Sequence, residues 1–212
     1  MNFRTEIKPP ENRLKLRHSD AVMLLGSCFS DNIGEKMREG MMQATVNPFG
    51  PIYNPLSIAS SVKRIITGER IAGMTLFLQS GVWNSFAFHS RYSMSSKDDA
   101  LDLMNSNIAQ AHEALKSCRM VIITLGTAVV YRLLATGEVV SNCHKVPQHE
   151  FSREMASVHE IPQALNETVE ALHGYNPELQ IVFTISPIRH IADGLDQNSL
   201  SKASLRVAVD RV

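Results

Sequence analysis

The stretch LLGSCFSDNIG, residues 24–34, decides the fold of this chain. An apolar run ends at Gly26, and the residues after it have helical spacing, with apolar side chains four positions apart at Phe29, Ile33 and Met37. An apolar strand that breaks at glycine and leads directly into a helix is typical of the β-α units that build parallel sheets. The sequence therefore predicts an α/β protein.

Further segments repeat this alternation along the chain. Four apolar runs predict parallel strands, at residues 21–27, 43–50, 119–126 and 180–187. Helical patterns are expected at residues 28–40, 54–68, 95–115 and 161–172. We expect Asn54 and Ser96 to cap two of these helices and Gly68 to end one of them.

The order of these elements predicts a three-layer α/β/α sandwich around a doubly wound parallel sheet. Two stretches, 74–93 and 129–147, do not fit the alternation and are expected to form hairpins, the second turning at residues 135–137. Hairpins inserted after strand ends can cover the crevice where such sheets bind ligands. We expect a single domain over residues 1–212. Because helical spacing still continues at Val212 and no fifth strand follows, we expect it to be truncated at its C-terminus.

The composition excludes several classes of partner. Lysine plus arginine and aspartate plus glutamate each total 21, so the formal charge is zero. No basic stripe argues for nucleic acid, and no polybasic amphipathic segment argues for a membrane surface. The start of the chain lacks the apolar core of a signal peptide, and three scattered cysteines are too few for a disulfide framework or a zinc knuckle. We expect a soluble, cytoplasmic protein with reduced thiols and with no metal or cofactor.

The break at Gly26 places two candidate nucleophiles, Ser27 and Cys28, at the start of a helix. The amide N–H groups and the positive end of the helix dipole favour a thiolate at Cys28, and they can also stabilise a tetrahedral oxyanion. Ser27 gains less, because a hydroxyl needs an adjacent base. The alternative is that Cys28 is a small buried hydrophobe, as free cysteines commonly are.

Several motifs, in the same order, resemble the GSCFA family, a branch of the SGNH (GDSL-like) hydrolase clan. These motifs are GSCFS (26–30), NPFGPIYNP (47–55), W-N-S…H-S (83–90), ITLGTAVVY (123–131), SNCHKVP (141–147) and SPIRH (186–190). Together they span most of the chain. The resemblance implies a flavodoxin-like α/β/α domain with its catalytic site at the carboxyl ends of the strands.

The resemblance also implies roles for individual residues. Aligning residues 26–28 with the clan's Gly-Asp-Ser turn places Cys28 at the nucleophile position. Gly50 matches the clan's glycine after the second strand, which helps to hold the oxyanion. A glycine beside proline is also typical of a turn with positive φ. Asn47 is a candidate substrate-binding residue, for which a cap or a turn is the stronger interpretation.

Two departures from the clan pattern affect the expected site. Thr127 follows the third-strand glycine where the clan has its asparagine donor, so Thr127 or a residue of the SNCHK loop (141–145) would have to replace that donor. The clan's Asp-x-x-His pair does not occur in the last part of the chain. The pair therefore lies beyond Val212, or the clan's triad is absent.

Three histidines belong to segments that follow strands or form hairpins: His89, His144 and His190. We expect His89 and His144 to be substrate-binding candidates. His190 is the candidate base if the chain is complete, although it could equally bond a loop carbonyl. His144 lies beside Cys143, but one adjacent Cys-His pair is a weak metal signal.

These features predict an SGNH-like acyl hydrolase or acyltransferase that acts on an ester or thioester through the GSCFS turn. A thiol nucleophile at Cys28 gives a thioester intermediate, which can pass its acyl group to water or to another acceptor. The expected partner is a small-molecule or carbohydrate ester, and a homodimer is expected if a sheet edge is exposed. One alternative is a catalytically silent binding module for a carbohydrate or nucleotide-like ligand. A weaker one is a redox-sensing thiol with Cys143 as its resolving partner.

Overall fold

A computed structural model of the chain describes residues 14–189 and 194–212. Its central sheet is parallel, in the order β2-β1-β5-β9. These strands are β1 (Ala21–Gly26), β2 (Ala44–Val46), β5 (Cys118–Leu125) and β9 (Gln180–Ile185). The four predicted strands are confirmed, but β2 ends at Val46 and not at residue 50. It stops there because Asn47 has a φ of +41° and proline follows it.

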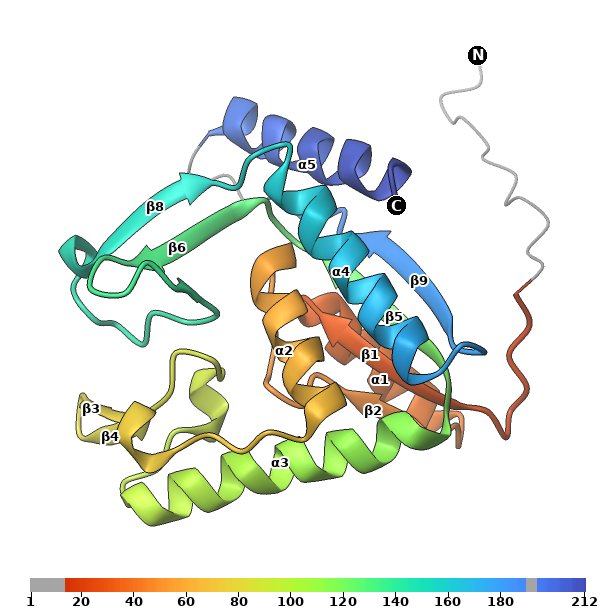
Figure 1. The fold of residues 1–212 in the computed structure, drawn as a ribbon, viewed down its shortest axis with the longest axis horizontal. Coiled ribbons are helices and arrows are strands. Elements are labelled where there is room, and N and C mark those ends of the chain that lie inside the picture. The colour runs from red at the N-terminus through yellow and green to blue at the C-terminus, as the bar shows by residue number, and fades with distance from the viewer. Residues whose placement is uncertain (1–13, 190–193) are drawn as a thin grey trace.

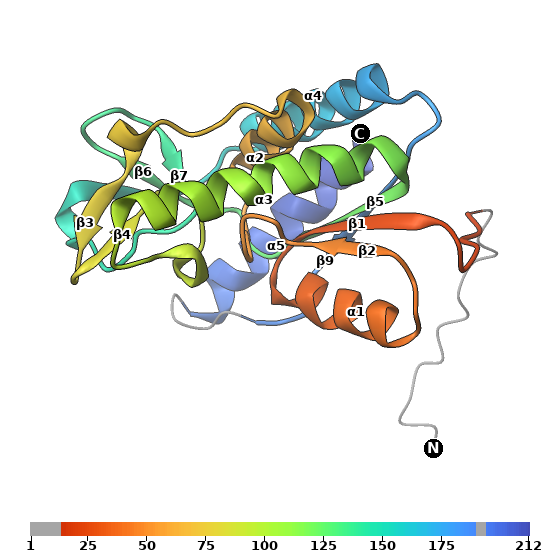
Figure 2. The same ribbon diagram turned by 90° about the horizontal axis from the view of Figure 1, so that it is seen from below.

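Helices lie on both faces of this sheet, as the sequence predicts. The long helices are α1 (Cys28–Glu39), α2 (Pro55–Thr67), α3 (Lys97–Ser117), α4 (Glu160–Tyr175) and α5 (Leu195–Asp210). Figure 2 shows α1 on one side of the sheet and α2, α3 and α4 on the other. The two apolar clusters of the core match these two layers, since Val22 and Leu24 pack with α1, whereas Met23 and Leu25 belong to the larger cluster.

The predicted helix ends are confirmed by their hydrogen bonds. The Asn54 side chain accepts from the Ser57 N–H at 2.8 Å, with proline at the first position of α2. The Ser96 hydroxyl accepts from the Asp99 N–H at 3.3 Å at the start of α3. Gly68 ends α2 in the left-handed conformation, with a φ of +66°. Local sequence therefore fixes where these helices begin and end.

Two small antiparallel sheets interrupt the alternation. The first pairs β3 with β4, and the second has the order β7-β6-β8. Their strands are β3 (Phe77–Gln79), β4 (Val82–Asn84), β6 (Val129–Leu133), β7 (Val139–Val140) and β8 (Phe151–Met155), and the short 3₁₀ helices are η1 (Gly73–Thr75), η2 (Ser90–Tyr92) and η3 (Gln148–Glu150). Both predicted hairpins are present, and the second turns at Thr136 and Gly137 as expected. The sequence analysis missed β8.

The two small sheets lie together beyond the carboxyl ends of the parallel strands (Figure 1). Phe86, just after β4, stacks on Phe77 with ring centroids 4.2 Å apart. It also meets Phe151 of β8 edge-on at 5.9 Å. Its carbonyl accepts from the Ser141 N–H at 2.8 Å. The two insertions therefore form one lobe beside the edge of the sheet where ligands bind in α/β proteins.

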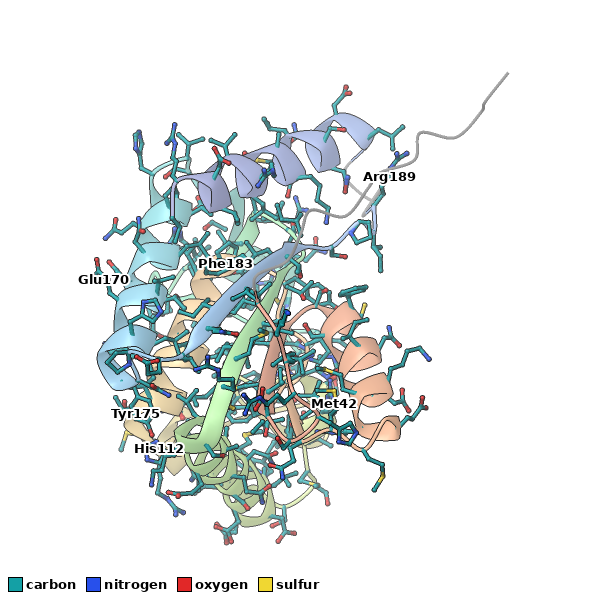
Figure 3. The ribbon with its side chains drawn as sticks, turned by 90° about the vertical axis from the view of Figure 1, so that its right-hand side faces the viewer. Met42, His112, Glu170, Tyr175, Phe183 and Arg189 are labelled. Atoms are coloured by element: carbon teal, nitrogen blue, oxygen red, sulfur yellow. The ribbon has the colours of Figure 1, made fainter. Side chains whose placement is uncertain are left out.

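Helix α5 crosses the carboxyl ends of β5 and β9, as Figures 1 and 3 show. Lys202 Nζ donates to the carbonyls of Gly126 (2.6 Å) and Ser186 (2.7 Å), one after each strand. Ser201 Oγ accepts from the Ala128 N–H at 2.8 Å. Burial lowers the pKa of Lys202. In the part of the chain that the structure describes, none of the helices is both long and apolar enough to cross a membrane.

Candidate active site

The turn after β1 requires glycine at its first position. Gly26 has a φ of +128°, and a Cβ there would overlap the carbonyl oxygen of Thr124 on the neighbouring strand β5. The same carbonyl accepts from the Ser27 N–H at 3.1 Å. The chain therefore bends tightly against β5 and begins α1 directly above the sheet.

Of the two candidate nucleophiles, Ser27 has a capping role. Ser27 is 1% exposed, and its hydroxyl accepts from the Phe29 N–H at 3.4 Å as the N-cap of α1. Cys28 is the first residue of α1 and is partly exposed. The hydrogen bonds of the turn use the amides of Gly26, Ser27, Phe29 and Ser30, but not that of Cys28. The turn thus presents the Cys28 thiol together with its own N–H.

Tyr53 is the side chain that meets this thiol. Its hydroxyl lies close enough to Cys28 for the two side chains to interact. Burial first, and then the charge of Cys28, raise the pKa of the Tyr53 hydroxyl above its usual value. The Tyr53 carbonyl accepts from the N–H groups of Gly126 (2.8 Å) and Thr127 (3.0 Å), which fixes the residue to the end of β5. The sequence analysis quoted Tyr53 within NPFGPIYNP but assigned it no role.

Asn47 braces the turn from the end of β2. It is 1% exposed, and its Oδ1 accepts from the Gly26 N–H at 2.8 Å. Its Nδ2 donates to Asp31 Oδ1 at 2.8 Å and approaches the Ser27 carbonyl at 3.5 Å. The structure therefore gives Asn47 the turn role that its sequence context favoured. One amide joins the end of β1, the start of α1 and the loop after β2.

An ion pair links α1 to the segment after the first small sheet. Arg91 Nη2 donates to Asp31 Oδ2 at 2.9 Å, and the two side chains are 41% and 33% exposed. Both charges act on the hydroxyl of Tyr53: Asp31 raises its pKa, and Arg91 lowers it. These residues are sixty positions apart in the sequence, so neither was identified there.

Gly50, the expected oxyanion residue, has its amide engaged within its own turn. Its N–H donates to the Asn47 carbonyl at 2.7 Å. Its φ is +84°, and a Cβ at this position would overlap the Cβ of His89. Glycine is needed here for the turn and for the close approach of His89. A second hydrogen bond, to an oxyanion, would have to compete with the one that closes the turn.

Thr127 also makes structural hydrogen bonds. Its N–H donates to the Tyr53 carbonyl, and its Oγ1 accepts from the Val129 N–H at 3.0 Å. The same hydroxyl lies 3.2 Å from Ser201 Oγ on α5. Thr127 thus joins the end of β5 to Tyr53, β6 and α5 without a contact to Cys28 in these bonds.

The two described candidate histidines are held by backbone groups. His89 Nδ1 accepts from the Arg91 N–H at 3.2 Å, and burial first, then Arg91, lower its pKa. His144 is 8% exposed and donates through Nε2 to the Ser85 carbonyl at 2.8 Å. Burial lowers its pKa. These contacts tie loops together and do not reach Cys28, and His190 lies outside the described residues.

A cavity of ≈ 470 Å³ opens on the far side of Tyr53. Its lining combines aromatic, amide and hydroxyl side chains with one arginine: Tyr53, Asn54, Thr127, Val129, Tyr131, Val140, Ser141, Asn142, Cys143 and Arg153. Burial raises the pKa of Cys143 there. A larger cavity of ≈ 730 Å³ lies between α2 and the small sheets, but neither Cys28 nor Tyr53 lines it. The smaller cavity is therefore the one that Tyr53 lines.

Comparison with known families agrees with the motifs. The model of the GSCFA family matches residues 21–212. The chain belongs to the GSCFA family. The GSCFA match begins at the first residue of β1 and covers the turn, the cavity and α5. No curated protein and no solved structure matches the chain. Within residues 14–189 and 194–212, no three His, Cys, Asp or Glu side chains are grouped so that they would hold a metal ion.

Proposed function

We propose that this GSCFA protein is an SGNH-like acyl hydrolase or acyltransferase in which Cys28 attacks the carbonyl of an ester or thioester. The observation that carries the proposal is the position of Cys28. It is the first residue of a helix that begins at the end of the first strand, beside a buried cap and the Tyr53 hydroxyl. Chemistry at this edge is the usual arrangement of open α/β sheets.

The sheet order supports the SGNH assignment. Counted along the chain, the parallel strands lie in the order second, first, third, fourth, which is how a flavodoxin-like sheet begins. The nucleophile turn follows the first of these strands. The helix start favours negative charge on a developing oxyanion. Ser27 is the weaker nucleophile candidate, because its hydroxyl already caps α1.

The cavity beside Tyr53 is the proposed substrate site. Tyrosine rings and amide and hydroxyl side chains line it, and this mixture suits a small polar ester, including an acylated carbohydrate. A histidine is expected as the base. His89 and His144 bond backbone groups, so His190 is the candidate that the sequence offers.

A catalytically silent binding module is the second candidate function. It is favoured by one observation, that the two expected oxyanion residues use their N–H groups in the fold. Gly50 donates to Asn47, and Thr127 donates to Tyr53. Such a protein would keep the cavity for a carbohydrate or nucleotide-like ligand without turning it over.

Acyl transfer onto the protein separates the two functions. The protein is incubated with p-nitrophenyl acetate, phenyl thioacetate and an acetylated monosaccharide, and the acylated residue is located by mass spectrometry. An enzyme acquires the acyl group on Cys28 and releases it on incubation with water or an alcohol. Cys28→Ala should abolish the adduct, whereas Cys143→Ala, which removes the thiol that lines the cavity, should keep it. A wild-type protein that never carries an acyl group on Cys28 is not an acyl enzyme, and ligands that raise its Tm without turnover would identify a binding module.

A further inference from the structure

We propose that Tyr53 is a catalytic residue, whose hydroxyl donates a hydrogen bond to the oxyanion that forms when Cys28 attacks a carbonyl. This inference rests on the proposed acyl chemistry and names a group that the family resemblance did not supply. It starts from the interaction between the Tyr53 hydroxyl and the Cys28 side chain, which helps to raise the pKa of the phenol. The phenol therefore lies beside the atom to which a substrate carbonyl must come.

The fold fixes Tyr53 from two sides. Its carbonyl accepts from two successive amides, those of Gly126 and Thr127. Its ring lies against Gly126, where an added Cβ would be 2.9 Å from Tyr53 Cδ1 and 3.1 Å from its Cβ. A donor held in place before the reaction stabilises developing charge most effectively, because it does not have to reorganise. Gly126 thus serves the site by letting the tyrosine ring lie directly on the end of β5.

The amides of the two expected oxyanion residues are already engaged in the fold. Gly50 uses its N–H for the Asn47 carbonyl at 2.7 Å, and Thr127 uses its N–H for the Tyr53 carbonyl at 3.0 Å. The Cys28 N–H takes part in none of the turn's hydrogen bonds. Cys28 N–H and Tyr53 O–H together give the two donors that a tetrahedral oxyanion typically receives.

The surroundings keep the phenol protonated, as a donor must be. Burial, the charge of Cys28 and the charge of Asp31 all raise the pKa of Tyr53, and Arg91 opposes them as the smallest of these effects. Tyr53 also lines the substrate cavity, whereas Cys28 does not. Tyr53 therefore both lines the cavity and interacts with Cys28, so its hydroxyl is the group that can donate to the carbonyl oxygen of an ester bound there.

The Cys28 thiolate forms a bond to the carbonyl carbon, and the electron pair of the C=O π bond moves to oxygen, where Tyr53 and the Cys28 amide donate to it. When the electron pair on oxygen re-forms the C=O bond, the bond between the carbonyl carbon and the alcohol oxygen breaks. The alkoxide that leaves takes a proton from water. The hydroxide that remains attacks the thioester, and the sulfur leaves as thiolate with a carboxylic acid as product. Tyr53 donates hydrogen bonds in both halves and keeps its proton.

Two reactions of the same thiol test this role. Alkylation by iodoacetamide displaces iodide and forms no oxyanion, whereas acylation by p-nitrophenyl acetate does. In Tyr53→Phe the ring and the backbone bonds remain, so we expect acylation of Cys28 to fall about 100-fold while alkylation changes less than about threefold. Tyr175→Phe is the matched control, because Tyr175 is a partly buried tyrosine at the end of α4 whose ring meets His112 edge-on, outside the substrate cavity. It should leave both rates within about threefold of the wild type.

Each outcome decides the proposal. Equal losses in both reactions would mean that Tyr53 acts on the thiolate alone, and unchanged acylation would mean that it does not act at all. Either result overturns the oxyanion role while acyl chemistry at Cys28 stands. A wild-type protein that is alkylated but never acylated at Cys28 contradicts the proposed function itself.

Should Tyr53→Phe not fold, difluorotyrosine at position 53 keeps the shape with a more acidic phenol. Acylation, but not alkylation, should then decline at lower pH than in the wild type, and an unshifted decline overturns the proposal.

Discussion

Cys28 and Cys118 both lie where a helix meets a strand, but at opposite ends of the sheet. Cys28 follows β1 and opens α1, so it lies at the positive end of a helix. Cys118 closes α3 and opens β5, so it lies at the carbonyl end. It is 4% exposed, and burial raises its pKa to about 11. The same residue type is thus partly exposed among polar groups at one junction and packed in the apolar core at the other.

The surroundings of the two thiols differ in the same way. Polar side chains from three segments converge on the Cys28 turn: Asn47, Tyr53 and, through Asp31, Arg91. Cys118 belongs to the large apolar cluster. In this fold, hydrogen bonds hold together the residues around Cys28 at the carboxyl ends of the strands. Apolar packing holds the residues around Cys118 at the amino ends. The following predictions test how far that contrast extends.

Thiol reactivity should show the largest difference. At about pH 8 iodoacetamide should label Cys28 in the folded protein at least about 100-fold faster than Cys118, because the thiolate is the reacting form and Cys118 is buried as the thiol. Peptide mapping by mass spectrometry after timed quenching measures both rates in one sample. In urea the two rates should converge. Similar rates in the folded protein would remove the basis of the comparison.

Substitution of Gly26 should damage the reactive junction most. Gly26→Ala combines a positive φ with an overlap on the Thr124 carbonyl, so we expect a loss of more than about 3 kcal/mol in the free energy of unfolding. Gly137→Ala is the matched control. Gly137 has a φ of +73° but nothing within 4 Å of an added Cβ, so only strain applies and the expected loss is about 1 kcal/mol. Urea denaturation measures both, and equal losses would show that the close approach to β5 is unimportant.

Replacing Asn47 by alanine should lower the free energy of unfolding by about 2–3 kcal/mol. Asn47→Ala leaves the buried Gly26 N–H without its acceptor and removes the bond to Asp31. Asn32→Ala is the control on the same helix, since the Asn32 side chain is exposed and donates only to the Cys28 carbonyl at 3.1 Å. Its unfolding free energy should stay within about 0.5 kcal/mol of the wild type. If both variants unfold alike, the turn does not depend on the buried amide.

Alkaline pH should lower the free energy of unfolding by about 2 kcal/mol through ionisation of Cys118. The pKa of this thiol rises from its ordinary 9.0 to about 11 in the folded protein. The unfolded chain therefore loses the proton first, so stability that is complete below about pH 9 declines as the pH approaches about 11. Denaturation at several pH values, with Cys118→Ala as reference, measures the effect. A constant difference between the two proteins across this range would contradict it.

Local patterns predicted much of the fold and part of the site. The parallel strands, the caps at Asn54 and Ser96 and the break at Gly26 each depend on neighbours in sequence, and each is confirmed. Strand β8 was missed because FSREM has two charged residues and no apolar alternation, and it becomes a strand by pairing with β6. Its structure depends on a partner that the local pattern does not reveal.

The interior of the site depends on contacts between distant positions. The Asp31–Arg91 ion pair spans sixty residues, and the bond from Lys202 to Gly126 spans 76. No local pattern pairs such residues, since a Gly or an Asp in a turn looks the same with or without a partner. The same limit explains why the sequence could suggest an oxyanion role for Gly50 but could not show that its amide is already bonded.

The anchoring of Tyr53 has a consequence for how the protein matures. Cys28 and Tyr53 leave the ribosome long before Gly126 and Thr127, whose amides hold the tyrosine carbonyl. In a nascent chain the Tyr53 side chain is therefore not yet held beside the Cys28 thiol. The two side chains come together only when β5 joins the sheet beside β1. In an unfinished or unfolded copy the Cys28 thiol therefore lacks its contact with Tyr53, which forms only when the sheet assembles.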